Sequence, residues 1–176
     1  MSLVRPVVLS LGTNLGDKEQ HMRSMVAGAR GFLVEPVRVS DLMETEPLGM
    51  TPDAPWFLNC LIAGGFDGTA RELLGRCHAV EQSLGRTRNG KWESRTADVD
   101  ILLFGDEQIA DDDLVVPHPQ IRSRRFCLEG LRQLVPDMVI PGVSMTMHEL
   151  YERMDSGVRR QNMRVLGTND CGRGAT

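Results

Sequence analysis

Residues 95–105 read RTADVDILLFG, an apolar run with two aspartates near its start and a glycine at its end. Side chains alternate between the two faces of a strand, so Asp98 and Asp100 should share one face while Val99, Ile101 and Leu103 share the other. This pattern predicts a strand over residues 97–104 that packs on a core through its apolar face. The opposite face then presents two carboxylates.

The segments before this strand alternate between strand-like and helix-like patterns. A capping box at Thr69-Ala70-Arg71-Glu72 begins one helix and Asp17 can cap another, whereas residues 44–55 hold three prolines and should form a long loop. The expected elements are strands over 7–11, 37–40 and 57–66 and helices over 18–31 and 69–84. With the strand at 97–104, this β-α-β-β-α-β order fits a ferredoxin-like unit, in which helices cover one face of an antiparallel sheet.

The remainder of the chain elaborates this core. Residues 114–119 should be rigid and extended, residues 125–134 a helix with Phe126, Leu131 and Leu134 facing inward, and residues 147–154 a short helix. We therefore expect an α+β fold, an α/β sandwich with a ferredoxin-like core, an antiparallel sheet and extra C-terminal helices. Residues 1–154 should form a single domain and residues 155–176, which hold several glycines and arginines, a loosely ordered tail.

The composition is that of one ordinary domain with its own core, since 41% of the 176 residues are hydrophobic and 25% are charged. A net charge of −4 supplies no basic field for nucleic acid. No apolar run approaches the roughly 20 residues of a membrane span, and the first residues lack the apolar segment of a secretion signal, so we expect a cytoplasmic protein. The four cysteines form no C-x-x-C pair and are interpreted as free thiols.

The two aspartates of the last strand are candidates for metal binding. Neighbouring carboxylates repel each other unless a cation lies between them, and Mg²⁺ prefers oxygen ligands. Arg86, Arg88, Lys91 and Arg95 all precede the pair closely. Carboxylates for Mg²⁺ and guanidinium groups for phosphate oxygens are what a nucleoside triphosphate needs, although neither standard glycine-rich phosphate motif occurs. A solvated strand edge beside a solvated basic loop is the alternative that these residues leave open.

His118 lies between Pro117 and Pro119, which fix the backbone and give the imidazole a definite direction. It is a candidate phosphate contact, and a structural role is the alternative. Arginines follow at positions 122, 124 and 125. Three cations at a helix start cannot all contact one ligand, so one or two of them should stay in water or bind carbonyls.

Six blocks of sequence follow one another in an order and spacing known from one enzyme family. The blocks are LGTNLG at 11–16, TEPLG at 45–49, FLN at 57–59, EQSLGR at 81–86, RTADVDILLFG at 95–105 and VPHP at 116–119. Together they resemble the 6-hydroxymethyl-7,8-dihydropterin pyrophosphokinases of folate biosynthesis, from about residue 5 to residue 153. Each block alone is weak evidence, but six in this order are hard to obtain by chance. The resemblance makes residues 1–154 a single pyrophosphokinase domain.

The resemblance implies transfer of the β,γ-pyrophosphoryl group of ATP to the pterin hydroxymethyl oxygen, with release of AMP. It implies two Mg²⁺ ions bridged by Asp98 and Asp100, with Asp98 also accepting the hydroxyl proton. Arg86 and Arg95 would complete the catalytic set by stabilising the negative charge of the transition state. The residues that would contact ATP are Glu81, Arg86, Arg88, Arg95, Ile101, His118 and Arg124.

Pterin is flat and rich in donors and acceptors, so its site needs aromatic rings beside it and polar groups at its edge. By resemblance, Phe57 and Phe126 supply the rings and Asn59 the polar edge, although core packing is the alternative for both rings. Trp92 would belong to a lid over both substrates. The residues expected to contact the pterin are Thr45, Pro47, Leu48, Gly49, Phe57, Asn59, Trp92, Asp98 and Phe126.

The chain departs from the commoner family pattern at three places. Glu93-Ser94 stands where many members carry Gly-Pro, Asp113 where some carry an arginine near the nucleotide base, and Glu129-Gly130 where a proline-leucine pair is frequent. Because these departures adjoin the lid and the base site, lid kinetics and adenine contacts do not transfer from the family.

Three other functions compete with this one. A single-stranded RNA module would need exposed aromatics and a basic face, where this chain carries two aspartates. A homologue that only binds nucleotide would not need the acidic pair together with Arg86, Arg95 and His118. A related kinase could act on another flat hydroxymethyl heterocycle. The expected partners are the small molecules ATP and the pterin, without nucleic acid or membrane, for a monomer or weak dimer.

Overall fold

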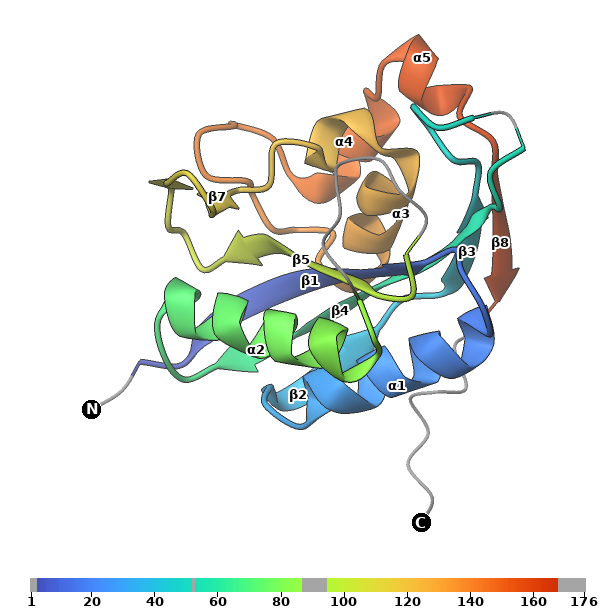
Figure 1. Ribbon diagram of the computed structural model, residues 1–176. Helices are drawn as coiled ribbons and strands as arrows, with labels where there is room; N and C mark the ends of the chain where they lie inside the picture. The colour runs from blue at the N-terminus through green and yellow to red at the C-terminus, as the bar shows by residue number, and fades with distance from the viewer. Residues whose placement is uncertain (1–2, 52, 87–94, 168–176) are drawn as a thin grey trace.

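A computed structural model describes residues 3–51, 53–86 and 95–167, which form an antiparallel sheet between two layers of helices (Figure 1). The strands are β1 (Arg5–Thr13), β2 (Val34–Val39), β3 (Leu42–Thr45), β4 (Phe57–Phe66), β5 (Asp98–Phe104), β6 (Ile109–Ala110), β7 (Val115–Val116) and β8 (Met163–Gly167). The helices are α1 (Lys18–Arg30), α2 (Ala70–Ser83), the 3₁₀ turn η1 (Ile121–Ser123), α3 (Arg125–Leu134), α4 (Met147–Glu152) and α5 (Ser156–Arg159). Within the described ranges, no helix has the length and apolar character needed to cross a membrane.

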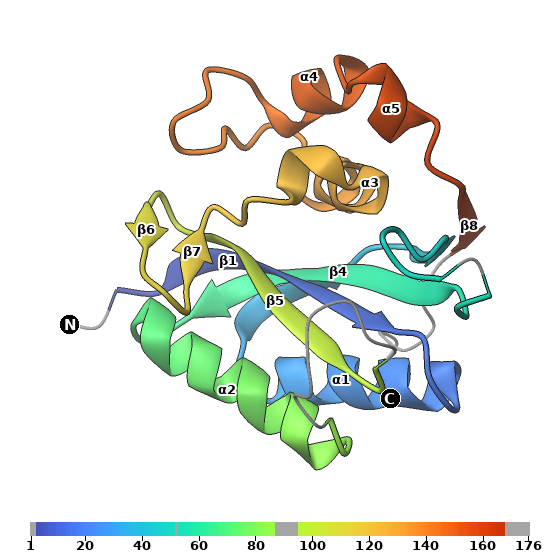
Figure 2. The ribbon, with the colours of Figure 1, turned by 45° about the horizontal axis from the view of Figure 1, so that its top comes forward.

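The main sheet has six strands in the order β5-β1-β4-β3-β8, and β2 also pairs with β4. All of these pairs are antiparallel, and β2 and β3 pair with different parts of β4. Helices α1 and α2 cover one face, while α3, α4 and α5 lie on the other (Figure 2). The expected α+β fold with an antiparallel sheet and additional C-terminal helices is confirmed.

Each face of the sheet carries its own core, because alternate side chains of a strand point to opposite faces. Leu9 and Leu11 of β1 pack with the buried face of α1 and α2, whereas Val8 packs with Leu128 and Leu131 of α3. The sheet is therefore fixed between two apolar layers. Its α3-facing side is the one that carries the acidic pair of β5.

The helix signals in the sequence are confirmed locally. Asp17 accepts a hydrogen bond from the backbone of Gln20 at the start of α1, and Thr69 and Glu72 form the expected capping box of α2. Helix α3 has the predicted bounds, with Leu131 and Leu134 buried. Three of the four cysteines, at positions 60, 77 and 127, are buried free thiols, and the fourth lies outside the described residues.

Two expectations about strands were wrong. The predicted loop over residues 44–55 begins two residues later, because residues 42–45 form β3, with Met43 opposite Asn59 of β4 and fully buried. In β5, Leu103 does not share a face with Val99 and Ile101. The register between β1 and β5 shifts there by one residue, so Leu103 turns to the α3 side.

The expectation of a loosely ordered tail was wrong for residues 155–167. Asp155 caps α5, and β8 pairs with β3 from Thr45↔Met163 to Leu42↔Gly167. This pairing satisfies backbone groups of β3 that would otherwise form an open sheet edge, which is why a polar, glycine-containing segment is ordered here. Residues 168–176 lie outside the described part of the chain.

Candidate active site

A row of four positions crosses the α3-facing side of the sheet at one end. Asp98 of β5 pairs with Gly12 of β1, and Gly12 pairs with Asn59 of β4. Asn59 donates from Nδ2 to Oγ1 of Thr45 on β3, over 2.8 Å. A Cβ at Gly12 would come within 2.8 Å of Asn59 Oδ1, so glycine is required for this side chain to lie across β1. The row joins the acidic pair to two of the residues expected to contact pterin.

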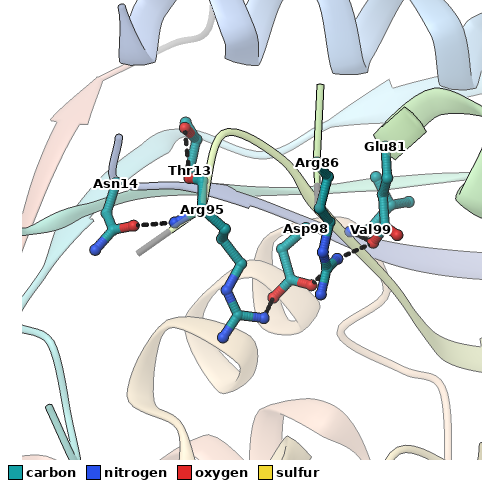
Figure 3. A network of polar contacts seen from close by, with 7 residues as sticks. All are labelled: Thr13, Asn14, Glu81, Arg86, Arg95, Asp98 and Val99. Carbon is teal, nitrogen blue, oxygen red and sulfur yellow. Dashed lines mark hydrogen bonds and ion pairs between the residues drawn. The ribbon is translucent and has the colours of Figure 1, made fainter. Parts of the chain in front are cut away.

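Two arginines hold the carboxylate of Asp98 (Figure 3). Arg86 Nη1 lies 2.6 Å from Oδ1, and Arg95 Nη1 lies 2.7 Å from Oδ2. All three side chains are only partly exposed, so these pairs are less screened than surface ion pairs. The expected proximity of the aspartate and the arginines is confirmed in the structure, and both guanidinium groups contact the same carboxylate.

Glu81 fixes this arrangement from α2. Its carboxylate is almost fully buried, pairs with Arg86 and accepts a hydrogen bond of 2.9 Å from the backbone N–H of Val99 (Figure 3). It therefore ties the last turn of α2 to the start of β5. A buried carboxylate is stable only with such partners, so Glu81 orients Arg86 rather than facing solvent.

Arg95 is fixed at its backbone by Asn14, which the residue patterns alone did not single out. Asn14 Oδ1 accepts from Arg95 N over 2.8 Å, and Asn14 N donates to Arg95 O over 3.1 Å (Figure 3). Thr13 Oγ1 also donates to Arg95 O, over 3.4 Å. Asn14 and Thr13 are buried at the end of β1. The only signal for them in the sequence is the short LGTNLG block.

Asp100 lies two residues further along β5, on the same side as Asp98. Burial, and then the negative charges of Asp98 and Glu81, raise the pKa of Asp100 to about 7, against the opposing effect of Arg95 and Arg86. Asp100 is thus a carboxylate withdrawn from water that also feels the negative charge of two other carboxylates. This is the electrostatic environment in which a bound cation is favoured.

The donor set fits Mg²⁺ that is also held by a ligand. Among the described residues, no group of three or more His, Cys, Asp or Glu side chains is arranged to hold a metal ion alone. Mg²⁺ is commonly bound by one or two carboxylates together with substrate phosphates and water. Asp98 and Asp100 supply two such carboxylates, so the chemistry of the pair suits a cation that arrives with a polyphosphate.

His118 interacts electrostatically with both Asp98 and Arg124, the residue just before α3. Its backbone N–H donates to Leu102 O over 2.9 Å, and its Nδ1 accepts from Gln120 N over 3.2 Å. Burial lowers the pKa of His118 below its ordinary value, and the charge of Arg124 lowers it further, while Asp98 opposes both. The imidazole is therefore neutral at pH 7, with Nδ1 as acceptor and the ring proton on Nε2.

A pocket lies at the Thr45 end of the row that crosses the sheet, between β3 and α3. Thr45, Leu48, Arg124 and Phe126 line it together with residues of the 161–163 segment. Phe57 is the register partner of Thr45 and, two residues before Asn59, faces the same side of the sheet. The pocket thus combines an aromatic ring, a cation and polar groups at its edge. Pro47 and Gly49 lie on either side of Leu48 in the same loop.

Some expected site residues are not brought into this arrangement. The side chain of Ile101 is buried in the core on the α1 and α2 side, so only its backbone can contact a ligand at the α3-facing side. Arg88, Lys91, Trp92 and Glu93-Ser94 lie outside the described residues. Asp113 pairs with Arg71 over 3.2 Å, in a surface cluster that also contains Asp111. The lid therefore stays a prediction.

Comparison with known proteins decides the family. The model of 7,8-dihydro-6-hydroxymethylpterin-pyrophosphokinase matches residues 8–136. The chain belongs to this family. It is 38% identical over 158 residues to the 2-amino-4-hydroxy-6-hydroxymethyldihydropteridine pyrophosphokinase of Methylorubrum extorquens, covering 86% of this chain and 96% of that protein. It is 39% identical over 127 residues to the enzyme of the same name from Bacillus subtilis, covering 72% of this chain and 75% of the relative.

Solved structures agree with the fold of a pterin pyrophosphokinase. A Plasmodium falciparum HPPK-DHPS chain superposes with a TM-score of 0.67 at 13% identity, over 86% of this chain and 46% of that one. An HPPK-DHPS structure described as being in complex with substrates gives a TM-score of 0.69 at 13% identity, over 85% and 43%. This chain therefore spans less than half of each of those proteins. As a member of its family, it is an enzyme, a pyrophosphokinase of the transferase class.

Proposed function

We propose that this chain transfers the pyrophosphoryl group of ATP to 6-hydroxymethyl-7,8-dihydropterin in folate biosynthesis, in a reaction that depends on two Mg²⁺ ions. The proposal rests on the ion pairs of Arg86 and Arg95 with Asp98. Asp100 lies beside Asp98 on the same strand. Asn59 reaches this row from β4, where it pairs with Gly12 of β1. This arrangement supports one site in which a polyphosphate and a flat heterocycle meet. A cytoplasmic location and a monomeric or weakly dimeric state stay predictions.

The reaction is a displacement at the β-phosphorus of ATP. The pterin hydroxymethyl oxygen forms a bond to this phosphorus, and the bond from phosphorus to the oxygen bridging it to the α-phosphate breaks. AMP leaves with the bridging oxygen, and the pterin keeps both transferred phosphoryl groups. The hydroxyl proton passes to Asp98, which is the carboxylate in register with Gly12 and Asn59 on the pterin side.

The arginines stabilise the charge that spreads over the phosphoryl oxygens. Arg86 and Arg95 are already fixed near Asp98, by Glu81 and by Asn14 respectively, so little reorganisation is needed when phosphate oxygens replace the carboxylate as partners. His118 donates from Nε2 to a phosphate oxygen because its Nδ1 is engaged. Arg124 adds charge to the lining of the pocket, and Arg88 would be a third arginine beside Arg86 and Arg95.

The metal site would be formed by Asp98 and Asp100 with phosphate oxygens. When bound, Mg²⁺ supplies neutralisation of phosphate charge and polarisation of the bond that breaks. The pterin would lie in the pocket of Thr45, Leu48 and Phe126, with Phe57 and Asn59 at its border. Flat stacking and amide hydrogen bonds then select the heterocycle.

The test is release of AMP from ATP and Mg²⁺ by purified protein, with and without 6-hydroxymethyl-7,8-dihydropterin. We expect pterin-dependent AMP, and a loss of at least about a hundredfold in turnover for Asp98→Ala and for Asp100→Ala. Asp106→Ala, an exposed acidic residue just after β5, is the matched control and should keep wild-type turnover. A folded protein that releases no AMP with the pterin refutes the proposal, and normal turnover in either site variant refutes the assignment of the carboxylates.

A further inference from the structure

The pocket between β3 and α3 has a third wall that comes from the C-terminal segment. Gln161, Asn162 and Met163 line it together with residues of β3 and α3, and Met163 is the register partner of Thr45. These residues lie beyond the 8–136 range of the family match. In Figure 2, the segment runs from α5 down to β8, on the same side of the sheet as α3. We call residues 159–163 the C-terminal bridge.

The bridge is bonded to the loop after β3. The carboxylate of Glu46 accepts from Asn162 N over 2.9 Å and from Asn162 Nδ2 over 2.7 Å. In return, Glu46 N donates to Asn162 O over 3.2 Å. Three reciprocal bonds between two residues fix both position and orientation. Glu46 adjoins Thr45 and lines the same pocket, so Asn162 sets where this wall lies.

The bridge is also bonded to the start of α3. Helix α3 receives no side-chain cap from its own N-cap residue, Arg124. Instead, Gln161 Oε1 accepts from Arg125 N over 2.9 Å, and Gln161 Nε2 donates to Ser123 O over 2.7 Å. Arg125 Nη1 donates to the carbonyls of Arg159 and Gln161, each over 3.1 Å. A distant residue thus performs the capping role at the turn that carries Arg124 and Phe126.

We propose that the C-terminal bridge is a positioning element for the pterin, with Asn162 and Gln161 as its positioning residues. It fixes the distance between the Thr45–Leu48 wall and the Phe126 wall, so the pocket is preformed before the heterocycle enters. Without the bridge, binding would have to order both walls, which weakens affinity for the pterin. The carboxylate cluster at the start of β5 has its own supports, and Asn162 bonds to Glu46 rather than to the turn of Arg124, so loss of the Asn162–Glu46 bonds should not change ATP binding. This inference rests on the proposed function.

The sharpest test exchanges donor and acceptor in the Glu46–Asn162 pair. Asn162→Asp places two carboxylates together, and Glu46→Gln brings two amides together. In the double variant, a glutamine amide can donate to the new carboxylate and its oxygen can still accept from the backbone of position 162. We expect Asn162→Asp to raise KM for the pterin about fivefold, with kcat and KM for ATP within about twofold of wild type. Glu46→Gln should raise it less, because the Asn162 amide can turn its oxygen toward the glutamine amide. The double variant should return the pterin KM to within about twofold.

Arg153→Ala is the matched control, since this arginine lies outside the bridge and its guanidinium bonds to Met145 Sδ rather than to either wall. It should leave all constants unchanged. Unchanged pterin KM in Asn162→Asp overturns the proposal, and so does a double variant whose pterin KM is no lower than that of Asn162→Asp. A parallel rise of both KM values with a fall in thermal stability would also overturn it, because that pattern indicates general loosening of the fold.

Hydrogen exchange separates failure of this inference from failure of the proposed function. Asn162→Asp should speed exchange of the backbone amides of residues 44–46 and 48 and leave α1 unchanged. If the wild type releases no AMP with the pterin, the proposed function fails, and this exchange measurement still decides whether the bridge holds the wall. Equal exchange at residues 44–46 and 48 in both proteins overturns the bridge even if the enzyme is active.

Discussion

Replacing Asp100 with asparagine should make the metal-free protein more stable at pH 8, although it removes a residue proposed to be essential for turnover. The pKa of this carboxyl is raised from 3.8 to about 7 by burial and by the charges of Asp98 and Glu81. The folded protein therefore binds this proton more tightly than the unfolded chain does. The ionised form that prevails at pH 8 disfavours folding, and asparagine, which cannot ionise, removes that penalty.

The size of this stability difference follows from the difference in the pKa of Asp100 between the folded and the unfolded protein. Each unit of pKa difference corresponds to about 1.4 kcal/mol, so a rise of about three units gives an upper bound of about 4 kcal/mol at pH 8. Asp100 is only partly buried, and solvent and side-chain relaxation reduce this figure. We expect the asparagine variant to be about 2 kcal/mol more stable at pH 8 and the difference to fall below half of that at pH 5.

Urea unfolding in EDTA, followed by circular dichroism between pH 5 and pH 8, measures this difference directly. The contribution of His118 is common to both proteins and cancels. Asp106→Asn is the control, because an exposed carboxyl should change stability by less than about 0.5 kcal/mol at any of these pH values. A variant that is less stable than wild type at pH 8, or a difference that does not vary with pH, would refute the electrostatic account of the acidic pair.

Three further outcomes are expected. Gly12→Ala should raise KM for the pterin about tenfold or more with a smaller change for ATP, because its Cβ would lie 2.8 Å from Asn59 Oδ1; steady-state kinetics with each substrate varied checks this. Arg95→Ala should lower kcat by about a hundredfold and change pterin affinity less, since its charge is needed mainly in the transition state; titration of the pterin beside turnover separates the two effects. Chelation of Mg²⁺ should weaken ATP binding strongly in calorimetry, and unchanged binding would contradict a carboxylate-held metal.

The parts of the fold that sequence predicted well are those whose signals are local. The capping box of α2 and the two-residue period at the start of β5, from Asp98 to Ile101, each specify their element within a few positions, and both are found in the structure. Local signals cannot show which strands pair. Strand β3 was missed because Met43 becomes buried only when it pairs with β4, and Leu103 was assigned to the wrong face because a register shift with β1 reverses the alternation.

The same distinction explains which parts of the site could be predicted. Arg86, Arg95 and Asp98 lie within 13 positions of one another, so the acid–base cluster is recognisable from the order of the residues alone. The C-terminal bridge is not, because Asn162 and Glu46 are 116 positions apart and both are ordinary polar residues.

Residues that bind phosphates must be charged, and several charged residues close together in the chain can be recognised in the sequence. Residues that only hold a pocket wall in place need a complementary partner, and the fold alone supplies it. A tail that is polar and rich in glycine can therefore still be a structural part of a binding site. For this chain, the decisive observation is the hydrogen bonding of residues 159–163 to the two walls rather than their composition.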